Sequence, residues 1–170
     1  MKRQMLTLLL GLTLPLLSAA DAGYLSATLS RVTYEESGAP DFAPLAAGLR
    51  IGGAVNEHVS LEVRLGLGIK DDSARGVDLK MDSYLGGFAR FMLPVNERVA
   101  VYALLGAARA KLTADNGLVS VSDSEKGLGY GLGAEMDLGP RAFAIIEYGR
   151  LVSGDDYDLD ALTLGLGRRF

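Results

Sequence analysis

The feature that most constrains this chain is a strict alternation of apolar residues with small or polar ones. Between Val59 and Lys70, every second residue is Val, Leu or Ile, and the residues between them are Ser, Glu, Arg, Gly or Lys. The same pattern recurs between Gly127 and Leu138. A period of two places successive side chains on opposite faces of a β-strand. Strands of soluble proteins usually have about 5 or 6 residues, whereas a tilted strand that crosses a bilayer needs about 9 to 11. The length of these stretches therefore favours strands that cross a membrane.

Similar stretches account for most of the chain beyond residue 23. The expected strands are residues 24–34, 44–55, 59–70, 80–93, 99–113, 126–138, 142–152 and 159–170. Their connections alternate between short (56–58, 94–98 and 139–141) and longer (35–43, 71–79, 114–125 and 153–158). Short periplasmic turns and longer extracellular loops are typical of up-and-down outer-membrane barrels. We therefore predict an all-β fold, an eight-stranded antiparallel up-and-down transmembrane β-barrel over residues 23–170. Arg31, Phe88 and Ile145 interrupt the alternation, and a β-bulge at each of them would explain this.

The two faces of the expected strands differ in a way that indicates which side meets lipid. One face combines Gly or Ala with charged residues, and the other is Leu, Val, Ile, Ala and Tyr. In water the second face would form an apolar patch far larger than a soluble monomer tolerates, so this face is expected to contact lipid. The alternative is a soluble sandwich or lipocalin-like barrel, which would bury the apolar face inside. Closure of the sheet would pair every backbone group within the hydrocarbon. The expected lumen charge network consists of Arg50, Glu62, Arg64, Arg90, Arg109, Lys111, Glu135, Asp137 and Glu147.

These charges of both signs are expected to pair across the lumen. Side chains nearly fill the interior of an eight-stranded barrel, which favours a plug of salt bridges and hydrogen bonds, with a narrow gated ion pathway as the alternative. Aromatic residues near the expected strand ends are candidates for interfacial girdles, with ordinary strand propensity as the alternative. They are Tyr24, Phe91, Tyr102, Phe143, Tyr148 and Phe170.

The first residues have the organisation of a secretory signal peptide. Lys2 and Arg3 precede an apolar stretch over residues 5–17, and small residues follow it. About a dozen apolar residues are too few for a membrane-spanning helix, which needs roughly 20. Cleavage after Ala20 or Ala22 would remove a signal peptide of residues 1–20 or 1–22, and the absence of cysteine excludes a lipoprotein. We therefore expect export to the cell outer membrane. The net charge of -4 and the lack of a basic run argue against a nucleic-acid partner.

The chain resembles the small OmpA/OmpX-like outer-membrane barrels and the related opacity-type surface proteins over essentially all of its mature sequence. Thr163, Gly165 and Phe170 match the polar, glycine and aromatic places of the C-terminal assembly signal of such barrels, whereas Arg168 departs from it. The resemblance implies a monomer that meets periplasmic chaperones and the barrel-assembly machinery during biogenesis. Outer-membrane lipid and lipopolysaccharide are its expected surroundings afterwards.

No catalytic, cofactor or metal site is expected. Enzymatic barrels commonly use a histidine as general base, and the one histidine, His58, falls in a short turn on the expected periplasmic side. The glycines of 127–133 alternate with the period of a strand and not of a phosphate-binding loop. The longer loops are acidic, through Glu35, Glu36, Asp41, Asp71, Asp72, Asp78, Asp115, Asp123, Glu125, Asp155, Asp156, Asp158 and Asp160.

Solvation is the simplest role for these loops, and divalent cations that bridge them to lipopolysaccharide phosphates are the alternative. Three functions follow for the whole chain. The leading one is a structural or surface-interaction barrel that acts in envelope integrity, adhesion or environmental contact. The others are a small solute or ion pore and, least favoured, a lipid-modifying enzyme.

Overall fold

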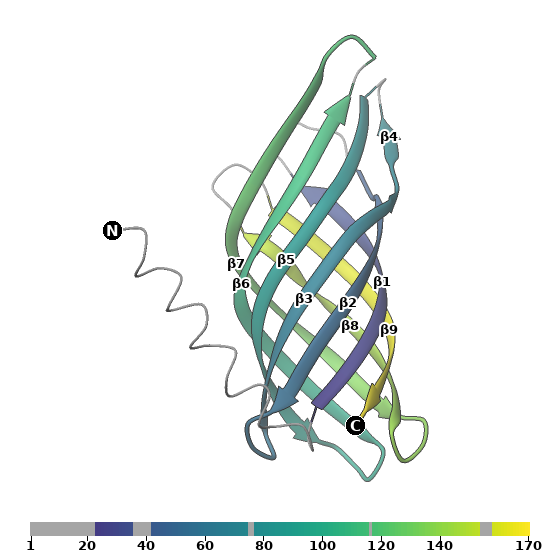
Figure 1. Ribbon diagram of the computed structural model, residues 1–170, viewed down its shortest axis with the longest axis vertical. Helices are drawn as coiled ribbons and strands as arrows, with labels where there is room; N and C mark the ends of the chain where they lie inside the picture. Colours follow the sequence, from purple (N-terminus) through teal and green to yellow (C-terminus); the bar gives the residue numbers. More distant parts are fainter. Residues whose placement is uncertain (1–22, 36–41, 75–76, 116, 154–157) are drawn as a thin grey trace, which may run out of the picture.

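The structure is a computed structural model, and it describes residues 23–35, 42–74, 77–115, 117–153 and 158–170. The predicted signal peptide lies outside these residues. Nine strands form within the described part of the chain (Figure 1). They are β1 (Gly23–Glu35), β2 (Leu45–Ala54), β3 (Val59–Lys70), β4 (Asp72–Ala74), β5 (Val77–Pro94), β6 (Val99–Asp115), β7 (Ser120–Asp137), β8 (Ala142–Ser153) and β9 (Asp158–Arg169). No helix in these ranges is long and apolar enough to cross a membrane.

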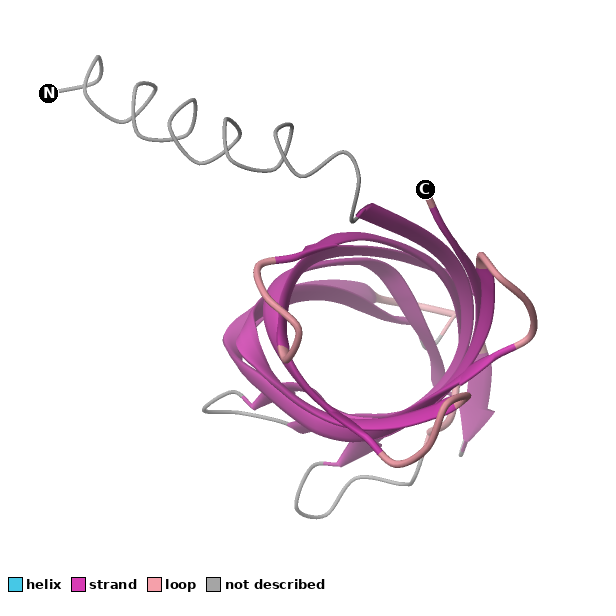
Figure 2. Ribbon diagram, turned by 90° about the horizontal axis from the view of Figure 1, so that it is seen from below, coloured by secondary structure: helices cyan, strands magenta, loops and turns pink. Residues whose placement is uncertain are grey.

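The strands close into one antiparallel barrel. The order runs β3-β2-β1-β9-β8-β7-β6-β5-β4, and an additional pairing of β3 with β5 closes the sheet. The short β4 follows β3 after one residue and pairs with the start of β5, so β3 and β4 occupy one position and the barrel has eight. Figure 2 shows the closed ring along its axis. The predicted fold class and strand number are confirmed.

Both described ends of the chain lie at the end of the barrel that carries the short turns. Gly23 and Phe170 meet there, where Phe170 N donates to Gly23 O at 3.0 Å. Asn56 and Asn96 stabilise two of the turns, because each side-chain oxygen accepts hydrogen bonds from the backbone N–H groups two and three residues further along the chain. This end corresponds to the periplasmic side of an outer-membrane barrel, and the opposite end to the cell exterior.

The three residues that interrupt the sequence alternation do not mark bulges. The register is continuous through Arg31, Phe88 and Ile145. Phe88 and Ile145 are large apolar side chains that point into the barrel, and Arg31 is a cation that points outward. The register irregularities lie nearer the extracellular end, at Asp82 of β5, Leu151 of β8 and Ile69 of β3. The bulge at Leu151 turns both Leu151 and Val152 inward. The sequence pattern did not predict this bulge.

Strands β5, β6 and β7 are longer than the sequence pattern predicts, and β5 and β7 show the largest differences. They have 18, 17 and 18 residues, and β7 pairs with β8 only from Leu128 onward. Their outer segments therefore rise above the other strands as a protruding sheet with β4 (Figure 1). Residues 114–125 and 71–79, expected as loops, are largely strand, because the hairpin hydrogen bonds continue beyond the apolar alternation. In the hairpin between β6 and β7, Gly117 has a φ of 80°, and its N–H donates to the Asp115 carboxylate at 2.7 Å.

The apolar residues of the barrel wall face outward. Large hydrophobic side chains that are 40 % or more exposed occur on every strand of the barrel wall. They include Leu25, Leu29, Leu49, Ile51, Leu61, Val63, Leu65, Leu85, Val101, Leu105, Leu128, Leu132, Ile146, Leu162, Leu164 and Leu166. The side chains of three arginines and three glutamates are buried inside. This arrangement reverses that of a soluble barrel and fits a hydrocarbon solvent.

Candidate functional site: the barrel interior

The middle of the lumen contains a network of buried charges centred on Glu147 of β8. Arg50 of β2 donates from both of its terminal nitrogens to the Glu147 carboxylate, at 2.8 and 3.1 Å. Arg64 of β3 does the same at 2.6 and 2.9 Å, and the Tyr102 hydroxyl donates at 2.9 Å. Two bidentate arginines and a phenol thus satisfy one carboxylate that is 4 % exposed. Arg50 and Arg64 are direct cross-strand neighbours, so Glu147 also separates two like charges.

A second group of contacts extends the network toward the periplasmic end. Glu62 accepts hydrogen bonds from Arg64 and, at 2.6 Å, from the Tyr24 hydroxyl. Arg90 donates to Glu135 at 2.9 Å and stacks on the Tyr102 ring, with 4.0 Å between the guanidinium carbon and the ring centroid. The three buried arginines and three buried glutamates balance in charge. Taking ions out of water is costly, and this balance together with the dense hydrogen bonding offsets that cost.

The periplasmic mouth carries a more exposed ion-pair group. Arg169 of β9 is ion-paired to both Glu135 and Asp137, and the Asp137 contact is 2.7 Å. The Arg169 guanidinium also stacks on Phe143, at 4.7 Å from the ring centroid. The side chains of Arg169 and Asp137 are 36 % and 38 % exposed, so water screens this pair. Asp137 therefore belongs to the rim of the network rather than to its dry centre.

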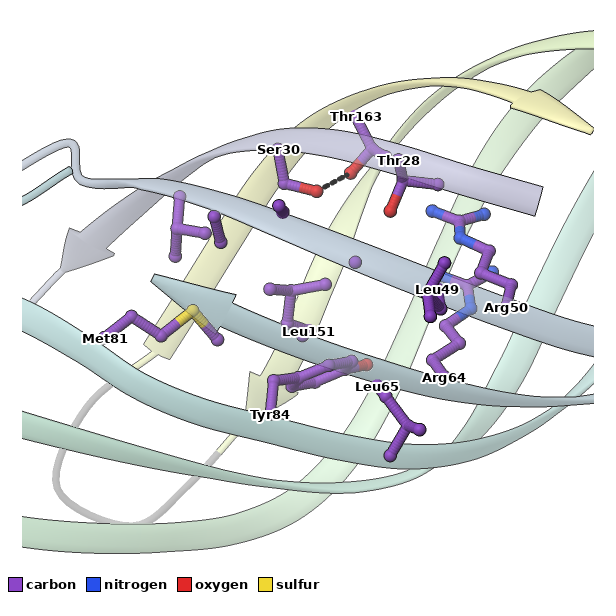
Figure 3. A pocket seen from close by; sticks show the side chains of 15 residues that line it. Thr28, Ser30, Leu49, Arg50, Arg64, Leu65, Met81, Tyr84, Leu151 and Thr163 are labelled. Atoms are coloured by element: carbon purple, nitrogen blue, oxygen red, sulfur yellow. Dashed lines mark hydrogen bonds between the residues drawn. The ribbon is translucent and has the colours of Figure 1, made fainter. Parts of the chain in front are cut away.

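On the extracellular side of the charges, the lumen is filled by apolar side chains. Val32, Met81, Val152 and Leu159 are each 1 % exposed or less. They belong to a buried cluster that also contains Phe42, Leu79, Tyr84, Phe88, Leu104, Leu112 and Leu151. Figure 3 shows Leu151 and Tyr84 between Met81 and the arginines Arg50 and Arg64, and all five line one pocket. A cavity between them holds about 30 Å³, which is room for a water molecule or two and not for a continuous column of water.

Glycines opposite aromatic residues make room for these rings. Tyr102 is the direct cross-strand partner of Gly133, and a Cβ at Gly133 would overlap the Tyr102 ring. Phe88 is likewise the partner of Gly106, and it also lies 2.7 Å from the position that a Cβ would take at Gly129. Gly129 and Gly133 are therefore sites of close approach to bulky lumen side chains, whereas a Cβ at Gly131 would meet the backbone of Tyr148 and Gly149.

The structure brings together six of the nine residues expected in the lumen network: Arg50, Glu62, Arg64, Arg90, Glu135 and Glu147. Asp137 joins at the mouth. Arg109 and Lys111 were predicted wrongly, because both side chains point outward on β6 and are exposed. The inward positions of that part of β6 are Ala108, Ala110 and Leu112. Charge alone suggested the lumen, but the register of β6 places these two cations on the outer surface.

Sequence reasoning missed four participants: Tyr24, Tyr102, Arg169 and Ser30. Tyr24, Tyr102 and Phe143 were considered for interfacial girdles, but all three are buried inside, whereas Phe91, Tyr148 and Phe170 face outward. The signal that distinguishes the inward rings is a glycine directly across the strand pair, which requires the register. Ser30 bonds Thr163 at 2.8 Å across the β1–β9 seam (Figure 3). Of the C-terminal signal residues, Thr163 and Gly165 face the lumen and Phe170 is exposed at the periplasmic end; a role in assembly stays a prediction.

The single histidine lies where the sequence placed it, in the exposed turn between β2 and β3. Its backbone N–H donates to Asn56 at 2.9 Å, and its carbonyl accepts from Met92 at 2.7 Å. These contacts define a structural turn. The histidine lies at the opposite end of the barrel from the protruding sheet.

A closed antiparallel barrel with an apolar exterior and a charged interior defines a small transmembrane β-barrel of the outer membrane. The comparisons with known proteins agree with this class. The chain matches the family model for the outer membrane protein β-barrel domain over residues 5–170, and it belongs to that family. Its location is therefore the outer membrane. None of the curated protein sequences matches the chain.

Several solved structures share the fold. The attachment invasion locus protein Ail of Yersinia pestis has a TM-score of 0.68 and 22 % identity, over 88 % of this chain and 99 % of that one. Neisserial surface protein A has a TM-score of 0.72 and 15 % identity, over 87 % and 97 %. The N-terminal barrel of OprF from Pseudomonas aeruginosa has a TM-score of 0.60 and 16 % identity, over 85 % and 97 %. At these identities the likeness concerns the fold alone.

Proposed function

We propose that this protein is a non-conducting surface barrel, and that its protruding hairpins contact partners outside the cell. The protruding sheet carries the proposal. The hairpin between β6 and β7 rises beyond the pairing with β8, and its tip exposes Leu118, Val119 and Val121 by 93 %, 59 % and 60 %. Exposed apolar side chains at the tip of this hydrogen-bonded sheet lie outside the barrel core and suit contact with another surface.

The contents of the lumen support the non-conducting part of the proposal. The dry ion network and the apolar layer lie in series along the axis, and each alone is a barrier to a hydrated ion. In planar bilayers, the purified protein is expected to give no resolved channel openings. Stepwise openings from the wild-type chain would refute the closed lumen and support the pore alternative. The proposal includes no catalytic activity.

A related barrel gives a first probe for the surface role. Ail of Yersinia pestis has been crystallised in complex with the heparin analogue sucrose octasulfate. Cells that express the present protein can be tested for attachment to cultured epithelial cells, with heparin-coated beads as a comparison that the acidic outer segment around Asp78 and Asp115 should repel. A Leu118→Ser/Val119→Ser/Val121→Ser variant should lose most of the attachment that wild-type cells show, because it removes the exposed apolar tip.

A matched control separates tip contact from a general effect of exposed valines. Val55→Ser/Val95→Ser changes two valines that are about equally exposed, 62 % and 60 %, in the periplasmic turns. This control should attach as wild type does. Both variants should keep the heat-dependent shift in electrophoretic mobility that marks a folded barrel. Equal attachment by wild-type cells, by the tip variant and by cells without the protein would refute the surface-contact role.

A further inference from the structure

The two cations that were wrongly expected inside the lumen form part of a basic patch on the outer surface. Arg109 of β6 is the direct cross-strand partner of Lys126 of β7, and both side chains are exposed. Lys111 and Lys80 lie on the same face of the sheet, further from the periplasm. We call these four residues the rim patch.

The charges within the rim patch are mostly uncompensated. Lys111 pairs with Asp82 at 3.4 Å. In the described ranges, Arg109, Lys126 and Lys80 have no ion-pair partner, which leaves an excess of positive charge. Like charges directly opposite each other on neighbouring strands destabilise a sheet. A pair such as Arg109 and Lys126 is therefore unfavourable by itself and becomes favourable when an anion lies between the two side chains.

The distance of the rim patch from the periplasmic end of the barrel indicates which anion it contacts. Arg109 lies about ten residues along β6 from Val99, which is ~34 Å of strand and ~25 Å of height at the usual tilt. The apolar band of an outer-membrane barrel is also about 25 Å tall. The outward side chains just below the patch are Leu85, Leu105 and Leu128, and each is more than half exposed. The patch thus begins where the lipid-facing belt ends, at the level of the outer-leaflet headgroups.

The charge changes sign further from the membrane. Asp78 and Asp115 face each other beyond Lys80 and Thr113. A cationic surface confined to the headgroup level suits phosphate groups fixed at that level, and the acidic segment beyond it repels polyanions that approach from solution.

We infer that the rim patch binds the phosphates of a phosphorylated outer-leaflet glycolipid, with Arg109 and Lys126 as its centre. An arginine binds phosphate through two parallel N–H donors, and the neighbouring lysine adds a second charge to the same anion. The long side chains lay their aliphatic stems along the apolar belt while their charged ends reach the headgroup. This inference depends on the outer-membrane location and not on partner binding by the hairpin tip.

Thermal unfolding of the full mature protein, extracted in neutral detergent, tests the inference. The readout is electrophoresis, in which the folded and the unfolded protein migrate as separate bands. The midpoint is the temperature at which half of the protein has moved from the folded band to the unfolded band. The probe is bis-phosphorylated lipid A added to the micelles, and the same lipid with its phosphates removed is the comparison. We expect the phosphorylated lipid to raise the midpoint and the dephosphorylated lipid not to, with a rise that shrinks as salt is added.

Variants identify the residues. Arg109→Gln/Lys126→Gln should lose the lipid-induced rise, and Lys126→Gln alone should reduce it. Without lipid, neither variant should melt below the wild type, because the like-charge repulsion is relieved. Arg31→Gln is the matched control, because Arg31 is an exposed outward cation whose cross-strand neighbours are Leu45 and Leu162; it should keep the full rise.

Four results would overturn the inference. The first is an equal rise in the wild type and the double variant, and the second is equal stabilisation by dephosphorylated lipid, which would assign the effect to acyl chains. The third is the same rise with inorganic phosphate at equal phosphate concentration, which would indicate a free anion. The fourth is a rise with sucrose octasulfate but none with lipid A, which would assign the patch to a sulfated glycan.

Discussion

Removal of the Glu147 carboxylate is the most direct test of the dry lumen network. In Glu147→Ala, Arg50 loses both of its charged hydrogen bonds, whereas Arg64 keeps its contact with Glu62. Arg50 and Arg64 are only 4 % and 3 % exposed, so water cannot replace the lost carboxylate without opening the lumen. Breaking one buried ion pair typically costs about 3 to 5 kcal/mol. Since Arg64 retains a partner, we expect a loss within that range and not twice as large.

The loss can be measured by urea titration of the folded band in detergent. Glu147→Gln keeps the shape and one acceptor oxygen, so its cost should fall between those of the wild type and the alanine variant. Arg50→Met/Glu147→Met removes one charge of each sign, and it should recover at least half of the loss, because it leaves no additional unpaired ion. A cost below about 1 kcal/mol for Glu147→Ala, or no recovery in the double variant, would show that water reaches the network and would refute the reasoning.

Three further predictions follow from the same geometry. Gly133→Val places side-chain atoms where the Tyr102 ring lies and should cost about 1 to 3 kcal/mol in the same titration, whereas Gly87→Val, with no atom within 4 Å of its Cβ, should be neutral. Arg169→Gln should cost less than about 1 kcal/mol, because its own side chain and that of Asp137 are more than a third exposed and the buried Glu135 keeps its pair with Arg90; a cost equal to that of Glu147→Ala would contradict the distinction between mouth and centre. Phe170→Ala should refold in detergent as the wild type does but give less protein in the outer-membrane fraction, and an unchanged yield would count against its role in the assembly signal.

The strand pattern could be predicted because lipid imposes it. Every lipid-facing position between Val59 and Ile69 must be apolar, so the period of two is visible in the sequence and the strand boundaries there agree with the structure. The protruding ends of β5 to β7 could not be predicted in the same way. Outside the bilayer both faces meet water, and strand residues such as Ser120 and Asp123 differ little in composition from a loop.

The lumen residues were predicted with mixed success for a related reason. Arg50, Glu62 and Arg64 lie in strands with clean alternation, so their facing follows from the sequence. In β6 alanines occupy both faces around Arg109, and only the pairing with β5 and β7 determines which way that arginine points.

The sequence by itself determined the class of the protein: alternating strands of membrane-crossing length, an even number of them, and a charged inner face. These properties are local, because each depends on the solvent that a strand meets on its two sides. The tertiary structure alone decided which charges meet. Arg50 and Glu147 are 97 residues apart in the chain, and their pairing depends on closure of the barrel and on the register of every strand between them. A shift of one residue in a single strand would exchange its lumen and lipid faces, and for that reason the network and the rim patch are properties of the closed barrel.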